Sequence, residues 1–272
     1  MIGVFYAFFA DKQGGDQIGG LNWGRDIHMS ARIKAFLVHG LVSIIIALLS
    51  MGLVYFIWYP APLAVATGVM HIFLLMLCID VVIGPLLTLL VYKTGKKTLK
   101  LDLTIICLLQ LAALTYGLFT VYQGKPAWLV YNVDRFELVR KNELVDTNIQ
   151  HAQPQFQKPS WFKPQYVATE FAKDIQQRND EMFAEVLGGI SIAQRPERYV
   201  ELTQAKTQIQ QRALPLVELQ QYNPKTDVEK TLAEYPKANA WLPLKANAVD
   251  MVVLVNKESA SIIKVVDLRP WQ

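Results

Sequence analysis

The chain has 272 residues, of which 52% are apolar, and these are concentrated in the first half. Its formal net charge of +4 does not indicate a nucleic-acid-binding protein, because from Gln123 onward 19 Lys and Arg stand against 18 Asp and Glu with no basic stripe. The surplus flanks the apolar segments, where basic residues set membrane topology.

Residues 1–28 are predicted to be an extension produced by a wrongly assigned start. Residues 1–10 are apolar but too short to cross a bilayer, and residues 11–20 are polar and rich in Gly. Neither stretch has the basic leader and cleavage site of a signal peptide. From Met29 the sequence has an ordinary beginning, a basic flank followed at once by an apolar segment. We therefore expect translation to start at Met29.

Three apolar segments are each long enough to cross the membrane, residues 36–58, 63–92 and 101–122. The second is long for one crossing, and Gly84-Pro85 is expected to interrupt its helical hydrogen bonds and cause a tilt or kink. Trp and Tyr side chains near the segment ends form the aromatic belts of a membrane protein. The sequence thus predicts a three-span transmembrane bundle over residues 29–122.

Basic residues predict the orientation of these spans. They precede the first span and fill the connection between the second and third, at Arg32, Lys34, Lys93, Lys96, Lys97 and Lys100. The positive-inside rule places the N-terminus and this connection in the cytoplasm. Three crossings then put residues 123–272 on the far side of the membrane from the cytoplasm.

A carboxylate lies in the middle of the second span, where it costs roughly 2.5 to 3.5 kcal/mol unless it faces protein or water. Asp80, Gly84 and Thr88 share one helix face, with Pro85 beside them. Gln110 lies at a similar depth in the third span. Two compatible interpretations stay open: an Asp80–Gln110 hydrogen bond inside the bundle, or docking of a partner transmembrane helix on this polar stripe, with small Gly84 allowing close approach.

Catalysis is not expected. An intramembrane aspartyl protease needs a second carboxylate beside Asp80, and the soluble half has one histidine, His151, and no cysteine for nucleophilic catalysis. No cofactor or metal motif is present in the sequence, and Cys78 and Cys107 are predicted to be small buried residues of the spans. His39 and His71 are not aligned with Asp80, so structural or interfacial roles are expected.

The soluble half is predicted to be an α+β domain with a small antiparallel sheet, one face of which is covered by helices. A strand is expected at 128–139 and a C-terminal hairpin at 251–255 and 262–266. Helices are expected between these strands, over residues 169–187, over residues 196–214, and from Thr226 with a capping box to Glu229.

Four motifs carry a family resemblance. They are Asp-x-x-x-Gly-Pro-Leu-Leu-Thr from Asp80, Val-Asp-Arg-Phe-Glu from Val133, Trp-Leu-Pro-Leu from Trp241, and Asp-Leu-Arg-Pro-Trp from Asp267. Together with the three spans, they make the chain resemble the type IV pilin accessory proteins of the TfpX/TfpZ kind of Gram-negative bacteria. The resemblance implies a non-enzymatic inner-membrane protein that helps a particular major pilin to be assembled or recycled.

On this resemblance we expect the partner to be a major type IV pilin in the lipid bilayer. The stripe of Asp80, Gly84, Pro85, Thr88 and Gln110 would pack its transmembrane helix. Its periplasmic head would contact the residues Asp134, Arg135, Phe136, Trp241, Arg269 and Trp271. The alternative is a membrane sensor or adaptor, but the predicted cytoplasmic segments are too small for an output domain.

Overall fold

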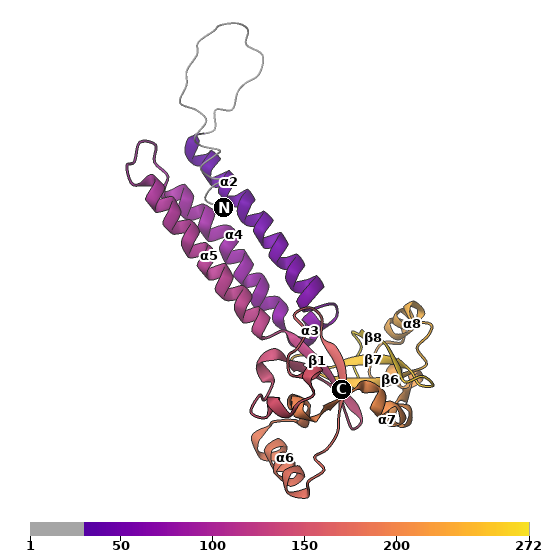
Figure 1. The fold of residues 1–272 in the computed structure, drawn as a ribbon. Coiled ribbons are helices and arrows are strands. Elements are labelled where there is room, and N and C mark those ends of the chain that lie inside the picture. The colour runs from indigo at the N-terminus through magenta and orange to yellow at the C-terminus, as the bar shows by residue number, and fades with distance from the viewer. Residues whose placement is uncertain (1–29, 272) are drawn as a thin grey trace. The chain divides into compact units, whose positions relative to one another are not determined.

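The computed structural model of the chain describes residues 30–271, so the predicted start at Met29 lies outside the described residues. Three helices are long and apolar enough to cross a membrane, Ala31–Trp58, Val69–Val91 and Leu99–Gln123, which lie side by side in Figure 1. The first combines α2 (Ala31–Gly52) with a π-helical end, η1 (Leu53–Trp58). The second and third are α4 (Val69–Val91) and α5 (Leu99–Gln123). The three predicted spans are confirmed.

The second apolar segment is divided near its beginning rather than at Gly84-Pro85. Residues Leu63–Thr67 form a separate short helix, α3, which ends at Gly68 in the left-handed conformation, φ 72°. Glycine adopts this conformation without the steric cost that a Cβ would bring. Helix α4 then continues through Pro85 to Val91. The membrane-length helix is therefore shorter than the predicted 63–92.

The chain forms two compact units. The helical bundle comprises the described residues 30–52 with His71–Thr120, and the C-terminal domain comprises Leu53–Met70 with Val121–Gln272. The connection between the first two spans thus belongs to the C-terminal domain. Leu63 and Ala66 are buried in its main core, and the Ala66 carbonyl accepts a 2.9 Å hydrogen bond from the Ala248 amide.

The C-terminal domain is built on an eight-stranded sheet in the order β4-β3-β1-β2-β6-β7-β8, with β5 paired to β6. Two neighbouring pairs, β1 with β3 and β2 with β6, are parallel and the others antiparallel. The α+β class is confirmed, and the sheet is larger than predicted and mixed. The strands are β1 (Pro126–Asn132), β2 (Arg135–Arg140), β3 (Gln165–Thr169), β4 (Tyr199–Val200), β5 (Leu214–Pro215), β6 (Ala240–Lys245), β7 (Met251–Asn256) and β8 (Ser261–Val266).

The predicted C-terminal hairpin is confirmed as β7 and β8. The single strand expected at 128–139 is instead the β1–β2 hairpin, which turns at Val133, φ 59°. The helix expected from 169 begins later, because residues up to Thr169 pair as β3. It is α6 (Ile175–Gly188), capped by Asp174 and ended at Gly189 in the left-handed conformation.

The other two predicted helices are shorter than expected. Residues 199–200 pair with β3 as β4, so only α7 (Lys206–Arg212) remains α-helical between 196 and 214. Helix α8 (Lys225–Glu234) has Pro224 at its N-cap and no capping hydrogen bond from a side chain. Single-turn 3₁₀ segments complete the domain: η2 (Lys141–Glu143), η3 (Ile149–His151), η4 (Pro154–Phe156), η5 (Ile192–Gln194), η6 (Pro196–Arg198), η7 (Leu202–Ala205) and the longer η8 (Leu216–Gln221).

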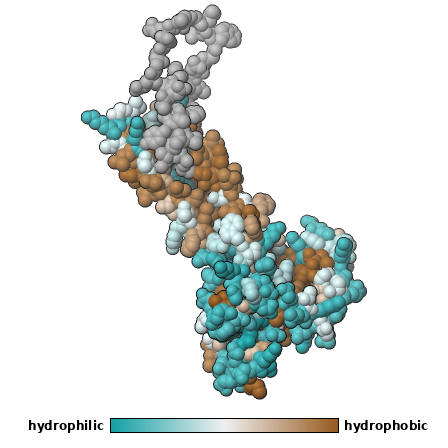
Figure 2. All heavy atoms as spheres, in the orientation of Figure 1, coloured by the Kyte–Doolittle hydropathy of each residue, from teal (hydrophilic) through white to brown (hydrophobic). Residues whose placement is uncertain are grey.

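The surfaces of the two units differ in character. Figure 2 shows a broadly hydrophobic surface on the helical bundle and a mainly hydrophilic surface on the C-terminal domain. Large exposed side chains such as Leu49, Ile72 and Leu90 cover the outside of the bundle. This arrangement suits a bundle surrounded by lipid and a domain surrounded by water.

Candidate functional site

The predicted polar stripe on α4 faces the interior of the bundle. Gly84, Pro85 and Thr88 are buried, and Asp80 is partly buried. A Cβ atom added at Gly84 would overlap the side-chain amide of Gln110 on α5. Gly84 therefore permits close approach of a helix, as expected of a small residue, but that helix is α5 of the same chain. Of the two compatible interpretations, packing inside the bundle accounts for Gly84, and docking of a partner on the stripe stays a prediction.

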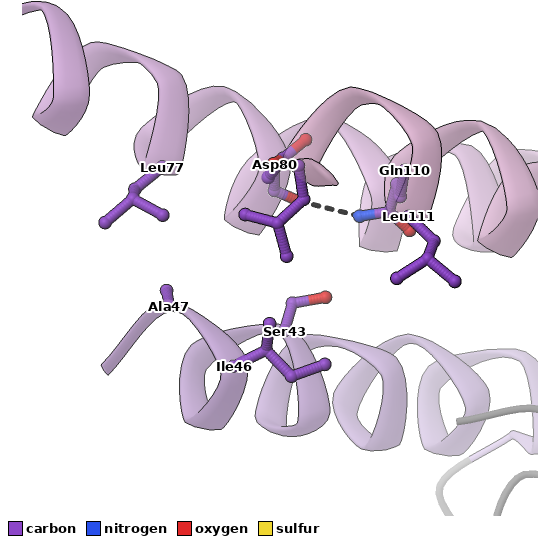
Figure 3. Close-up of a pocket in the computed structure, with 8 residues that line it drawn as sticks. Ser43, Ile46, Ala47, Leu77, Asp80, Gln110 and Leu111 are labelled. Atoms are coloured by element: carbon purple, nitrogen blue, oxygen red, sulfur yellow. Dashed lines mark hydrogen bonds between the residues drawn. The ribbon is translucent and has the colours of Figure 1, made fainter. Parts of the chain in front are cut away.

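The Asp80–Gln110 contact exists in a different form from the predicted one. Gln110 Nε2 donates a 2.8 Å hydrogen bond to the backbone carbonyl of Asp80 and not to its carboxylate, as Figure 3 shows. Among the described residues no hydrogen-bond partner is found for three buried oxygens, Asp80 Oδ2, Gln110 Oε1 and Ser43 Oγ. These residues come from three different helices and line one cavity of about 30 Å³. A mostly apolar cavity thus brings three polar side chains together and is large enough to hold one water molecule.

A second polar contact joins α2 to α4. His39 Nδ1 lies 2.6 Å from Thr88 Oγ1, and both side chains are buried. His39 and Ser43 are four residues apart and so lie on the same face of α2. The structural role expected for His39 fits this contact, but the sequence did not connect it with Thr88. The available signal was the shared depth of the two residues near the same end of neighbouring spans.

Both cysteines are free thiols. Cys107 is buried as predicted, whereas Cys78 is exposed on α4, so the prediction for Cys78 is wrong. Between residues 30 and 271, no group of three or more His, Cys, Asp or Glu is arranged to hold a metal ion.

An apolar groove of about 450 Å³ lies between α2 and α4. A Cβ atom added at Gly40 would lie 3.8 Å from Pro85, so the two residues face each other across its floor. Of the predicted stripe, Pro85 alone also lines this groove. Its lining consists of Phe36, Leu37, Gly40, Leu41, Ile44, Val81, Val82, Pro85 and Leu86.

The predicted patch in the C-terminal domain does not form one site. Phe136 is fully buried against Tyr131, with ring centroids 5.3 Å apart, and Trp241 is buried with its indole N–H donating to the Pro215 carbonyl at 3.0 Å. Both side chains belong to the core of the domain, so neither is presented at its surface. Asp134 and Arg135 are exposed at the β1–β2 turn, with a loose ion pair of 3.7 Å.

Arg269 and Trp271 fasten the end of the chain to the domain. The Arg269 amide donates to Asn223 Oδ1 at 2.7 Å, and Trp271 Nε1 donates to Asp250 Oδ2 at 2.8 Å. The other oxygen of Asp250 accepts the Ala246 amide at 2.7 Å. Asp250 therefore ties the C-terminal residues to the β6–β7 connection, a structural arrangement.

A buried lysine in the C-terminal domain was not predicted. Lys125 is fully buried and donates from Nζ to the Ser160 and Phe162 carbonyls, at 2.6 and 3.0 Å. Burial, and secondarily the charge of Lys141, lowers the pKa of Lys125 to about 8. An ammonium group held by two carbonyls without a carboxylate is costly to bury. Lys125 therefore fixes the loop at 160–162.

The family model and the known proteins that match this chain are all described as fimbrial assembly proteins. The family model described as fimbrial assembly protein FimB matches residues 27–68. Fimbrial assembly proteins of Dichelobacter nodosus serogroups I and E1 are each 29% identical over 230 residues, covering 81% of this chain and 89% of theirs. The protein of serogroups C1 and C2 is 33% identical over 110 residues, covering 40% of this chain and 84% of its own. No solved structure matches.

Proposed function

Because the chain belongs to the fimbrial assembly protein FimB family, we propose that it is an inner-membrane accessory protein that holds unassembled pilin subunits. The family names support a role in pilus biogenesis, as an assembly factor rather than a known enzyme. The three membrane-length helices make it a multi-pass membrane protein. The observation that carries the proposal is that one chain joins a lipid-compatible bundle to a large α+β domain.

In this proposal the C-terminal domain lies in the periplasm. The support is the distribution of basic residues, which flank the ends of α2, α4 and α5 that would face the cytoplasm. A reporter that is active only in the periplasm, fused after Trp271, is expected to be active. A reporter that is active only in the cytosol and works at the same position would overturn this orientation.

The intramembrane contact is proposed to use the groove between α2 and α4. The polar residues that the sequence singled out, Asp80, Gly84, Thr88 and Gln110, then act by fixing the helices of the bundle. The groove is lined mostly by apolar side chains, and at Gly40, which faces Pro85, no side chain fills it. Small residues at such surfaces let helix backbones approach closely in lipid.

Filling the groove tests this proposal directly. In a strain whose own copy is deleted, the Gly40→Leu variant is expected to leave pilin in the inner membrane and to reduce surface pili. Gly52→Leu is the matched control, because it makes the same change on α2 at a position where an added Cβ meets nothing within 4 Å. Equal piliation by both variants, at equal membrane levels, would contradict the use of the groove.

Complementation with Asp80→Asn tests whether the charge of residue 80 is required or only its shape and packing. Since the Asp80 carboxylate accepts nothing from Gln110, the amide is expected to restore piliation. Failure to do so at normal protein levels would show that the ionised group has a direct role. Deletion of the whole gene distinguishes the sensor alternative, which requires normal piliation with altered transcription.

A further inference from the structure

Helix α6 of the C-terminal domain has a charged residue on its inward side and apolar residues on its outward side. Its inward side carries Glu181, which is 9% exposed and pairs with Arg198 at 2.6 Å. Its outward side carries five large apolar residues, all exposed: Ile175, Met182, Phe183, Val186 and Leu187. A helix on the surface of a water-soluble domain has the opposite arrangement. The fold thus holds α6 through charge and leaves its apolar face uncovered.

Four of these apolar residues form one continuous face. Met182, Phe183, Val186 and Leu187 are neighbours at helical spacings of three and four, whereas Ile175 lies on the same side of the helix but beyond Asn179. Figure 2 shows hydrophobic atoms at the end of the domain where Figure 1 labels α6. Single exposed apolar residues are ordinary, but a continuous patch marks an interaction surface.

A cleft lies near α6, and Arg178 links the helix to it. Phe171 is exposed, lies under the Arg178 guanidinium of α6 at 5.7 Å from the ring centroid, and also lines a cleft of about 330 Å³. The cleft opens beyond the ends of the parallel strands β1 and β3, between Asn132, Thr169 and Gln208. Asn132 and Thr169 hydrogen-bond to each other within the domain, whereas the Gln204 and Gln208 amides in the lining can bind the backbone or side chains of a peptide.

The acidic residues beside the apolar face of α6 indicate which kind of partner it binds. Asp180 and Glu185 lie on opposite flanks of the apolar face by helical spacing, and the single basic residue of α6, Arg178, lies beside Glu185 and donates to the Ala172 carbonyl. Helices that bind anionic membranes carry Lys and Arg on their polar face, so the acidic flanks of α6 disfavour lipid. A symmetric pairing of two α6 helices would bring these acidic flanks against each other.

We propose that α6 and the adjoining cleft dock an apolar helix with basic flanking residues, presented by a protein partner. This inference deepens the proposed function and rests on it for the partner, because the helix would then belong to the pilin subunit. The apolar stripe supplies the contact area, and Asp180 and Glu185 supply the charge that selects the partner.

Site-specific crosslinking in cells tests the proposal with the full chain. A photo-crosslinking residue at Val186, 78% exposed, is expected to capture a protein whose crosslinked peptide is apolar, helical by pattern and flanked by Lys or Arg. The matched control is Val217, 67% exposed on η8 of the same domain, which should capture none. Glu185→Lys should reduce capture at Val186. Capture of a second copy or of lipid, or equal capture at both positions, would overturn the proposal.

Substitution separates this inference from the proposed function. With the photo-crosslinking residue moved to the neighbouring Leu187, 81% exposed, Val186→Asp is expected to weaken partner capture by about tenfold or more, the loss at a central interface residue, and to reduce piliation. Val217→Asp, the same change at a similarly exposed valine, should do neither. Loss of pili on gene deletion with normal piliation of Val186→Asp would refute the inference alone. Specific capture of a basic-flanked helix with normal piliation after deletion would refute the proposed function alone.

Discussion

The helical bundle and helix α6 share an inverted arrangement of side chains in different surroundings. In the bundle, His39 and Thr88 meet in the interior while Leu49 and Leu90 are exposed. In α6, Glu181 is turned inward while Val186 is exposed. The bundle consists of three helices that are long enough to cross a membrane, so lipid covers its apolar exterior.

A helix with polar side chains inward and apolar side chains outward is stable in lipid, whereas in water the same arrangement leaves an apolar surface that a partner can cover. Helix α6 belongs to a domain whose other surface is mainly polar and whose core follows the ordinary rule, with Leu129 and Val253 fully buried. Neither water nor an anionic membrane suits its apolar face. A protein partner does, and the comparison can be tested by changing the inward-facing polar groups of each region.

The largest effect is expected from Glu181→Ala. Removing this carboxylate leaves Arg198 partly buried without its partner, which should lower the free energy of unfolding by roughly 3 kcal/mol. Helix α6 should become the first site of limited proteolysis in the detergent-solubilised chain. The control is Glu229→Ala, because the Glu229–Lys225 pair is exposed at 3.6 Å and should contribute at most about 0.5 kcal/mol. Equal losses would mean that charge does not hold α6.

The bundle should respond next most strongly to Gly84→Ala. The added methyl group displaces the end of the Gln110 side chain and breaks its hydrogen bond to the Asp80 carbonyl, at a cost of about 1.5 kcal/mol. In a Gln110→Ala background the same change should cost much less, because the obstructing side chain is gone. Thermal unfolding of all four forms in detergent measures the coupling. Additive effects would show that Gly84 and Gln110 do not pack together.

Helical periodicity predicted which residues share a face of a helix, but it could not predict which helix packs against that face. It placed Asp80, Gly84 and Thr88 together on α4, yet whether α5 or a partner covers them depends on packing between helices distant in sequence. Hydropathy found the three spans, but Leu63 and Ala66 are as apolar as a span and belong to the core of the C-terminal domain. Only Gly68 marks the boundary.

The short strands could not be predicted from the sequence, because they too depend on contacts with residues distant in the chain. Residues 199–200 form β4 only because Ala168 and Thr169 pair with them from 30 residues away. Phe136 was expected as a contact because of its motif, and its burial is set by strands that pair across the sheet. Local signals succeeded where the pattern was long or closed by glycine, as in the C-terminal hairpin and the end of α6.

A smaller, pH-dependent effect is expected in the C-terminal domain, where Lys125 is a buried polar group comparable to those of the bundle. Its pKa is about 8 in the folded chain and 10.5 without burial. Between these values the unfolded chain binds a proton that the folded chain does not, so stability from this group rises with pH. The gain should be about 1 kcal/mol from pH 8 to pH 9. Lys125→Met should lack this rise, and exposed Lys163→Met should retain it. Identical pH profiles for the two variants would contradict the burial of a charged Lys125.

The smallest effect is expected from Thr88→Val, which keeps the shape of the side chain and removes its contact with His39 Nδ1. Hydrogen bonds between transmembrane helices contribute about 0.6 kcal/mol on average, so the bundle should lose stability by that order. Thr115→Val is the control, because the Thr115 hydroxyl is bonded to the Leu111 carbonyl of its own helix. Since the interior face is assigned to bundle stability alone, piliation should follow unfolding stability in both variants. A Thr88→Val protein of unchanged stability and lost piliation would show that this face also meets the partner.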